Sequence, residues 1–451
     1  MTSRLRNLIL IAGDATALYV SLYVSLWLRG GDTLAGGFWG TYFLPFTFLH
    51  ATWLAAFYIN DFYAPRRWRP NPAFFTALAK ATLINGLLAI VFFYLYQSSG
   101  ISPKTNLLVH LILSAVAIVG WRWLATLTLQ AKLMREPALF VEMDACSADH
   151  VAQLANDPTA NWGVAGMVHL SEHTPLSGSH WIADAAALSR LAAERGVRTI
   201  VVGNVAYHGL RSELFDLMLS GVTVRDAASF WEDLHGEVPL DCADAAWFFA
   251  GFADTRRLAY DAFKRLLDVL AALVLFLLFW WLMLLVALAV RLTGPGRTLY
   301  RQRRVGLFGA PFTIYKFRTM TADAEKDGAQ WSVKNDPRVT RLGRFLRHTH
   351  LDEFPQLWNI LKGEMSFIGP RPERPEFVEQ LKGALPFYSL RHLVKPGITG
   401  WAQVNYPYGA SVEDAKRKLA FDLYYVKRRS VFLDLQIALK TIRMVFVGEG
   451  R

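Results

Sequence analysis

The chain has 451 residues, of which 53% are hydrophobic and only 19% are charged, so part of it should lie in lipid rather than in water. Its formal net charge of +11 indicates an anionic partner. Because the sequence contains no recognisable nucleic-acid-binding module, we expect the anionic partner to be a phosphorylated substrate or an anionic lipid, and not a nucleic acid. Two cysteines are too few for a disulfide framework or a four-cysteine metal site, which is typical of a reducing compartment.

Four long apolar stretches fill the first third of the chain, each close to the ~20 residues needed to cross a bilayer. Basic residues are concentrated before the first stretch, in the connection YAPRRWRP after the second, and at the exit of the fourth. Because basic connections stay in the cytoplasm, both ends of this bundle should face the cytoplasm. The sequence predicts a four-helix transmembrane bundle over residues 1–135, with spans at residues 8–28, 42–59, 77–96 and 107–129.

Asp14 lies inside the first apolar stretch, where a carboxylate is costly. Such a carboxylate either pairs within the bundle, lies near the membrane interface, or marks a functional site. We predict one of the first two roles for Asp14 and keep a functional site as the alternative.

Residues 136–253 alternate between short strands and helices. ALFVEM, VAGMVHL, RTIVVG and VTVRD are typical of strands, and the stretches between them are typical of helices. This alternation predicts a small parallel sheet of Rossmann type. A dinucleotide site needs a glycine-rich turn after the first strand, but that turn reads VEMDACSADH. We therefore expect a Rossmann-like α/β domain without a cofactor, used for packing or regulation.

A fifth apolar run, residues 264–292, is also long enough to cross a membrane. Lys264 and Arg265 precede it and several arginines follow it, so both flanks should face the cytoplasm. We predict a re-entrant helix that enters and leaves by the same face, with an ordinary fifth span as the alternative. With the residues that follow, this helix would form an α-rich α+β domain over residues 254–451.

The stretch HLDEFPQLWN places two carboxylates, Asp352 and Glu353, before a proline that is tolerated in a first helical turn. Arginines and lysines recur around it, which suits a diphosphate or, alternatively, anionic lipid headgroups. Adjacent helical side chains point about 100° apart, so the two carboxylates can have separate tasks. One can attack phosphorus while the other holds a divalent cation. The plainer alternative is that Asp352 caps the helix.

Three motifs in the C-terminal region resemble those of the bacterial sugar transferases that form polyisoprenyl-diphosphate sugars, the monotopic phosphoglycosyl transferases. They are KFRTM (Lys316–Met320), LDEFPQLWNILKGEMSFIGPRPE (Leu351–Glu373) and KPGITGWAQVN (Lys395–Asn405). The four spans and the α/β domain resemble the long subgroup of that family, whose members start capsule, O-antigen or exopolysaccharide synthesis. SFWEDLHGEVPLD (Ser229–Asp241) resembles the usual end of its middle domain.

The resemblance implies a two-step transfer by a multi-pass protein of the bacterial inner membrane, with the catalytic domain facing the cytoplasm. Asp352 would attack the sugar-bearing phosphate of a UDP-hexose and release UMP, and undecaprenyl phosphate would then take the phosphosugar. Glu353, with Asp352, would hold Mg²⁺. The substrate and phosphate contacts would come from Arg371, Lys316, Arg318, Arg347, Arg301 and Asp422. Bracing of the fold stays open for Lys316 and Arg318, as does a structural ion pair for Asp422.

The chain departs from the family pattern at two places. The membrane helix has no proline near its middle, where Trp280 and Trp281 stand, and His350 replaces a common serine. His350 is either a titrating neighbour of the carboxylates or a local hydrogen-bond partner. The sequence does not identify the sugar, and the bundle and α/β domain offer surface for a homodimer. A non-catalytic membrane scaffold of a polysaccharide assembly complex is the alternative function.

Overall fold

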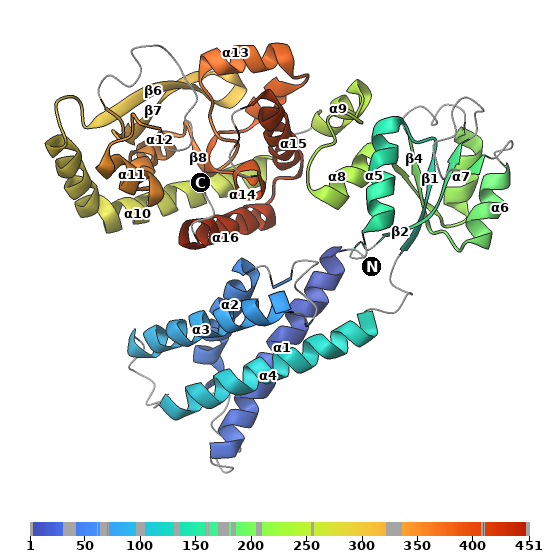
Figure 1. Cartoon of the computed structure of the whole chain (residues 1–451), viewed down its shortest axis with the longest axis horizontal. Coiled ribbons are helices and arrows are strands. Elements are labelled where there is room, and N and C mark those ends of the chain that lie inside the picture. Colours follow the sequence, from blue (N-terminus) through green and yellow to red (C-terminus); the bar gives the residue numbers. More distant parts are fainter. Residues whose placement is uncertain are drawn as a thin grey trace. The chain divides into compact units, whose positions relative to one another are not determined.

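The chain divides into two compact units, Met1–Ala227 and Ala228–Arg451, in the computed structural model (Figure 1). We expected boundaries after residues 135 and 253. Those boundaries stay predictions, and the contacts divide the chain inside the last part of the expected α/β domain. The structure describes residues 3–29, 42–60, 62–63, 70, 72–95, 104–129, 136–157, 160, 162–169, 180–181, 186–203, 210–253, 257–321, 336–406, 409 and 411–447.

Apolar helices open the first unit. Three of the four contain segments long and apolar enough to cross a membrane, whereas the second has 16 residues, fewer than the ~20 that a span needs. The prediction of several apolar N-terminal helices is confirmed, and a full crossing by the second stays a prediction. The helices are α1 (Ser3–Arg29), α2 (Leu44–Ile59), α3 (Pro72–Leu95) and α4 (Lys104–Leu129).

A buried ion pair joins α1 to α4. Arg122 donates from Nη2 to Oδ2 of Asp14 at 2.5 Å and from Nε to Oδ1 at 3.2 Å, and neither side chain is exposed. The rings of Phe62 and Tyr63 lie 4.9 and 5.1 Å from the guanidinium carbon. The predicted pairing of Asp14 within the bundle is confirmed.

A five-stranded parallel sheet in the order β3-β2-β1-β4-β5 fills the rest of the first unit. Strand order reverses between β1 and β4, as in Rossmann-type folds, so the predicted sheet is confirmed. The short strand β3 was not expected. The elements are β1 (Glu136–Val141), α5 (Ala145–Asn156), β2 (Trp162–His169), β3 (His180–Trp181), α6 (Ala186–Glu194), β4 (Thr199–Val202), α7 (Arg211–Leu219) and β5 (Thr223–Asp226).

Acidic residues occupy the first turn of this sheet. Asp144 caps α5 by accepting the backbone N–H of Ser147 at 2.7 Å. Glu142 has a φ of 51°, and its carboxylate lies 3.7 Å from Nδ1 of His169. A pyrophosphate would meet these carboxylates where dinucleotide-binding folds offer backbone N–H groups. This chemistry disfavours a dinucleotide, and the cofactor-free character of the domain stays a prediction.

The second unit combines many helices with two small sheets, one of them parallel, so the expected α-rich α+β content is present. Strands β6 and β7 form an antiparallel hairpin. The elements are α8 (Ala227–His235), α9 (Ala245–Phe252), α10 (Leu258–Leu292), β6 (Leu299–Val305), the 3₁₀ turn η6 (Leu307–Gly309), β7 (Pro311–Phe317), α11 (Arg341–His348), the 3₁₀ turn η7 (Leu351–Gln356), α12 (Leu357–Lys362), β8 (Ser366–Ile368), α13 (Pro375–Ala384), the 3₁₀ turn η8 (Tyr388–Leu393), β9 (Gly397–Thr399), α14 (Trp401–Asn405), α15 (Val412–Arg428) and α16 (Val431–Val447).

Helices α8 and α9 are anchored within the second unit by buried charge. Glu232, which is fully buried, accepts from Lys427 Nζ at 2.6 Å and from Arg428 Nε at 2.7 Å. The Lys427 ammonium also lies 3.6 Å from the ring centre of Trp247. We expected SFWEDLHGEVPLD to close the α/β domain. These contacts with α15 explain why its residues group with the second unit.

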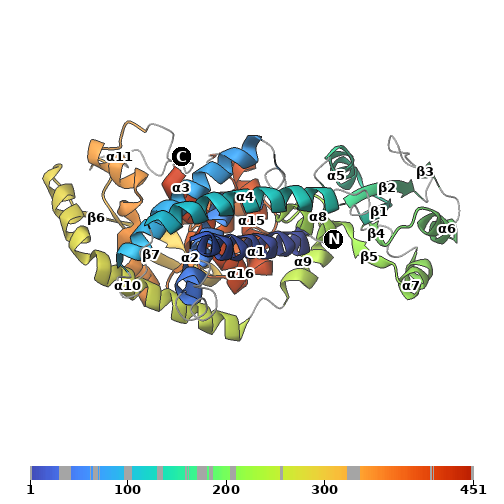
Figure 2. The same cartoon turned by 90° about the horizontal axis from the view of Figure 1, so that it is seen from below.

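Helix α10 has 35 residues and bends between its two halves (Figures 1 and 2). The N-terminal half packs through Ala272 and the C-terminal half through Val290, each against residues of the same unit. Phe354 packs against both the cluster around Ala272 and the cluster around Val290. Its ring lies edge-on to that of Phe279, with the ring centres 5.6 Å apart. The helix therefore turns without a proline, around an aromatic side chain supplied by the LDEFPQ stretch.

Candidate active site

Asp352 and Glu353 lie in the 3₁₀ turn η7, directly after a reversal of the chain. His350 adopts a left-handed conformation with φ 57° and occupies the cap position of that turn. Asp352 lies inside the turn and not at its cap position, which His350 occupies without a side-chain capping hydrogen bond. Helix α12 follows and ends at Gly363, whose φ of 85° suits glycine.

Two cations from separate elements hold Glu353. Lys316 Nζ of β7 and Arg371 Nη2, beyond β8, donate to Oε1 at 2.6 and 3.0 Å. The Glu353 side chain is 11% exposed, whereas that of Arg371 is 38% exposed. Burial by itself would raise the pKa of Glu353, but Lys316 and Arg371 outweigh it and hold that pKa below its usual range. Glu353 is therefore an anion at neutral pH.

Asp352 is buried beside this cluster, with 6% of its surface exposed. Neighbouring side chains in a 3₁₀ turn point about 120° apart, so Asp352 and Glu353 face different directions. The turn thus presents one carboxylate that cations fix and a second that approaches the site from another side. The division of tasks between a nucleophile and a metal ligand stays a prediction.

Arg318 contacts the end of α10 rather than Glu353. It donates to the carbonyl oxygens of Val290 at 3.2 Å, Gly294 at 3.0 Å and Pro295 at 2.7 Å. These bonds satisfy carbonyl groups that a helix end leaves open. Arg347 also bonds to a neighbouring group of the protein, because its Nε donates to the Thr319 hydroxyl at 2.9 Å. Both arginines brace the surroundings of the site, and phosphate contacts by them stay predictions.

Arg301 lies on the other face of the β6–β7 hairpin from Lys316. Residues directly opposite in an antiparallel pair share a face, and successive residues alternate between faces. Arg301 is opposite Tyr315, whereas Lys316 is opposite Tyr300. The structure therefore brings Lys316 and Arg371 to Glu353 and places Arg301 away from them.

Asp422 forms a closed ion pair behind Arg371. Arg391 donates from Nε and Nη2 to Oδ2 of Asp422 at 3.1 and 2.7 Å, and from Nη2 to the Arg371 carbonyl oxygen at 2.9 Å. Burial raises the pKa of Asp422 against the lowering effect of Arg391. The pair supports the backbone of Arg371, and a substrate contact by Asp422 stays a prediction. Sequence reasoning missed Arg391, which lies in none of the three motifs and is 31 positions from Asp422.

The carboxylates suit a divalent cation. Mg²⁺ prefers oxygen ligands and usually combines one or two carboxylates with water and substrate phosphates. Glu353 uses Oε1 for Lys316 and Arg371, and within the described residues no donor is bonded to its Oε2. Oε2 of Glu353 and the Asp352 carboxylate are therefore the oxygen donors that fit Mg²⁺ here.

Comparison with known proteins agrees with the motifs. Residues 259–448 match the family model described as bacterial sugar transferase. This range covers α10 except for its first residue, Leu258, and all of the residues around Glu353. A UDP-glucose:undecaprenyl-phosphate glucose-1-phosphate transferase of Caulobacter vibrioides is 44% identical over 196 residues, which is 43% of this chain and 73% of that relative. The chain belongs to the bacterial sugar transferase family.

Two other bacterial sugar transferase relatives are matched over a smaller share of their length. A UDP-N-acetylgalactosamine-undecaprenyl-phosphate N-acetylgalactosaminephosphotransferase of Aeromonas hydrophila is 47% identical over 191 residues, 42% of this chain and 45% of the relative. A UDP-glucose:undecaprenyl-phosphate glucose-1-phosphate transferase of Escherichia coli is 41% identical over 189 residues, 42% of this chain and 41% of the relative. The chain thus matches less than half the length of these two proteins.

Proposed function

We propose that this protein transfers a hexose-1-phosphate from a UDP-sugar to undecaprenyl phosphate, giving undecaprenyl-diphosphate-sugar and UMP. The observation that carries the proposal is the placement of Asp352 beside Glu353, Lys316 and Arg371, in a turn that packs against the apolar helix α10. A nucleophile and a diphosphate-binding set thus lie next to a lipid-embedded helix. The reaction would be the first membrane step of exopolysaccharide, capsule or O-antigen synthesis.

The transfer proceeds in two displacements at one phosphorus atom. An Asp352 carboxylate oxygen bonds to the sugar-bearing phosphorus, the phosphorus–oxygen bond to the nucleotide breaks, and UMP leaves with the electron pair. A phosphate oxygen of undecaprenyl phosphate then bonds to the same phosphorus, and the bond to Asp352 breaks. A carboxylate nucleophile divides one difficult displacement into two. The acceptor is already an anion at neutral pH, so the second step needs no strong general base.

Glu353 and its two cations arrange charge for the donor diphosphate. An arginine has five N–H donors, so Arg371 can bind a phosphate oxygen while it still holds Glu353. Lys316 keeps Glu353 ionised and in place. Mg²⁺ bound to Glu353 and Asp352 would offset negative charge on the diphosphate.

We propose that helix α10 lies in the membrane as a re-entrant helix. Near its start, Arg265 donates to the carbonyl oxygens of Ile360 and Leu361, and near its end Val290 accepts from Arg318. A straight helix would set these two points about 38 Å apart, more than the ~30 Å hydrocarbon core. Both points contact the same unit, and both flanks are basic, so the helix enters and leaves by the cytoplasmic face. The catalytic unit then faces the cytoplasm at the bacterial inner membrane.

Cysteine accessibility tests this topology. Single cysteines at the exposed positions Ala259, in the first turn of α10, and Arg303, in β6 beyond its end, should both react with an impermeant thiol reagent only from the cytoplasmic side. The wild-type chain, which has no cysteine at either position, gives the background. A periplasmic signal at position 303 with a cytoplasmic signal at position 259 would show an ordinary fifth span.

UMP release tests the activity. The purified full chain is incubated with Mg²⁺, undecaprenyl phosphate and, in turn, UDP-glucose, UDP-galactose and UDP-N-acetylgalactosamine. We expect UMP from at least one donor and continued turnover only with the acceptor. The scaffold alternative predicts no UMP from any donor, and a lipid-diphosphate phosphatase predicts inorganic phosphate instead. The homodimer, for which the bundle and the α/β domain offer surface, stays a prediction.

A further inference from the structure

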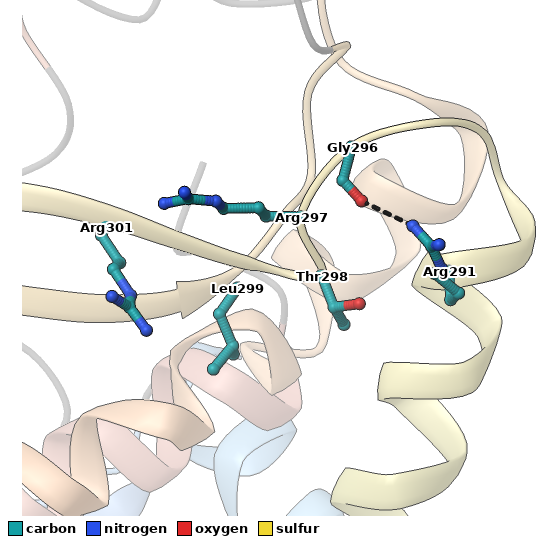
Figure 3. A pocket seen from close by; sticks show the side chains of 6 residues that line it. All are labelled: Arg291, Gly296, Arg297, Thr298, Leu299 and Arg301. Carbon is teal, nitrogen blue, oxygen red and sulfur yellow. Dashed lines mark hydrogen bonds between the residues drawn. The ribbon is translucent and has the colours of Figure 1, made fainter.

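A shallow cavity of about 680 Å³, open to the surface, lies where α10 passes into β6. Arg291 donates to the Gly296 carbonyl oxygen at 3.0 Å, and Arg301 lies 5.6 Å from the ring centre of Tyr315. Within the described residues, neither of these arginines nor Arg297 forms an ion pair with a carboxylate. The lining residues, drawn in Figure 3, are Arg291, Gly296, Arg297, Thr298, Leu299 and Arg301.

The turn that carries these side chains is fixed in place. Arg318 donates to the carbonyl oxygens of Gly294 and Pro295, and Gly294 and Gly296 have φ values of 143° and 118°, which favour glycine. Because an ordered backbone holds the arginines, the cavity is a preformed concentration of positive charge. A hydroxyl donor, Thr298, completes a lining that suits phosphate oxygens.

This cavity is separate from the carboxylate site. Arg301 and Leu299 lie on one face of the β6–β7 hairpin, and Lys316, which holds Glu353, lies on the opposite face. An anion in the cavity therefore does not occupy the place of the donor diphosphate.

The cavity also adjoins lipid-facing surface. The exposed leucines of α10 continue as far as Leu288 and Leu292, the latter 78% exposed, and Leu299 adds an exposed apolar side chain to the cavity itself. Given the proposed membrane placement of α10, its C-terminal end lies at the level of the lipid headgroups. Arginines at that level attract anionic lipid.

We propose that this cavity binds the phosphodiester headgroup of an anionic membrane phospholipid, as a site distinct from that of the acceptor lipid. Arg297 and Arg301 supply the charge, and the exposed leucines contact the glycerol and the start of the acyl chains. The bound lipid would hold the end of α10, and with it the bracing residue Arg318, at the membrane surface.

Lipid titration of the delipidated full chain in detergent, followed by native mass spectrometry, tests the proposal. Dioleoylphosphatidylglycerol should bind, and the Arg297→Gln/Arg301→Gln variant should bind it about 30-fold more weakly, since each basic residue near the surface contributes about fivefold. Arg297→Lys/Arg301→Lys should recover most of the affinity. If the double glutamine variant unfolds, Arg297→Gln alone should still show about a fivefold loss.

The control is Arg303→Gln, which removes an exposed arginine from the same strand outside the cavity and should leave affinity within about twofold, because the effect is local. Equal losses in Arg303→Gln and the double variant would overturn the proposal in favour of diffuse surface charge. Equal binding of dioleoylphosphatidylcholine would overturn it in favour of lipid without headgroup selection. Arginine-dependent binding of undecaprenyl phosphate or inorganic phosphate, without binding of phosphatidylglycerol, would assign the cavity to the acceptor or to soluble anions. Asp352→Asn should bind phosphatidylglycerol like the wild type, so a failed transferase assay leaves this test intact.

Discussion

The bundle and the catalytic unit each bury a carboxylate against an arginine, but they do so in opposite ways. Asp14 and Arg122 are both fully buried, bonded through two pairs of atoms, and covered by aromatic rings. Glu353 is nearly buried, but it shares one oxygen between Lys316 and Arg371, and Arg371 is 38% exposed.

This difference in exposure and bonding indicates which of the two sites has charge available to bind a ligand. In the bundle both carboxylate oxygens of Asp14 accept from Arg122 and neither side chain is exposed, so the pair serves structure. In the catalytic unit two positive charges converge on one carboxylate and one of them is accessible, so positive charge remains for a bound anion. The pair of Asp422 and Arg391 resembles the bundle pair, being 3% and 6% exposed, and it supports the accessible site from behind.

Removing Asp14 should give the largest effect on stability. Asp14→Asn leaves Arg122 buried without its charge partner, which typically costs about 3–5 kcal/mol of unfolding free energy. Thermal unfolding in detergent should show a lower midpoint, while UMP release by the folded fraction stays unchanged. Asp14→Asn/Arg122→Met should recover most of the loss because no charge remains unpaired. If Asp14→Asn kept its stability but lost activity, Asp14 would be a functional residue. The distinction between a structural pair in the bundle and a ligand-binding cluster at Glu353 would then fail.

Neutralising Glu353 should affect activity more than stability. Glu353→Gln removes the charge that Lys316 and Arg371 hold and one expected Mg²⁺ ligand, so UMP release should fall about 100-fold. The matched control is Glu379→Gln, which changes a side chain that is 74% exposed on α13 and should keep full activity. Near-normal activity in Glu353→Gln would make its ion pairs structural, like that of Asp14.

Acid should lower the stability of the catalytic unit because Glu353 becomes protonated. Its pKa in the folded chain lies below the ordinary value of 4.5, so below about pH 4.5 the unfolded chain binds a proton that the folded chain does not. The stabilisation is therefore complete above that pH and is lost as the pH falls further. Thermal midpoints measured from neutral pH downward should fall more steeply for the wild type than for Glu353→Gln. Parallel curves would show that Glu353 is not held by its cations.

Lys440 should give the smallest effect, with the opposite pH dependence. Burial lowers its pKa to about 8, beside the ring of Trp401 and the Asn405 side chain. Between about pH 8 and the ordinary value of 10.5 the unfolded chain binds more protons, so stability should rise with pH over this window. Lys440→Met should remove that rise, whereas Lys382→Met, at an exposed position on α13, should not. An unchanged slope in Lys440→Met would contradict the burial of its charge.

Much of the fold follows from local sequence patterns. The apolar stretches coincide with α1–α4, and the strands and helices expected between residues 136 and 226 are present in the expected order. The turn of α10 could not be predicted because its cause is not local. Phe354 lies 75 positions along the chain from Phe279 (354 − 279), and only the folded structure brings the two rings together.

The sequence indicates the candidate residues, but it does not indicate how their side chains are arranged. Asp352, Glu353, Lys316 and Arg371 all lie in the motifs KFRTM and LDEFPQLWNILKGEMSFIGPRPE, which resemble those of the family. Which cation meets which carboxylate depends on strand register and chain reversal: Lys316 reaches Glu353, while its neighbour Arg318 binds the end of α10. Arg391 carried no signal, since a single arginine outside a motif reads as surface charge.

The central claim is that Asp352 carries the phosphosugar. Intact-mass measurement after incubation with the UDP-sugar that supports UMP release, with Mg²⁺ and without acceptor, tests it directly. We predict an added mass of one hexose phosphate, located by peptide mapping on Asp352, absent in Asp352→Asn and discharged by undecaprenyl phosphate. UMP release with no such adduct, or an adduct that persists in Asp352→Asn, would contradict the account.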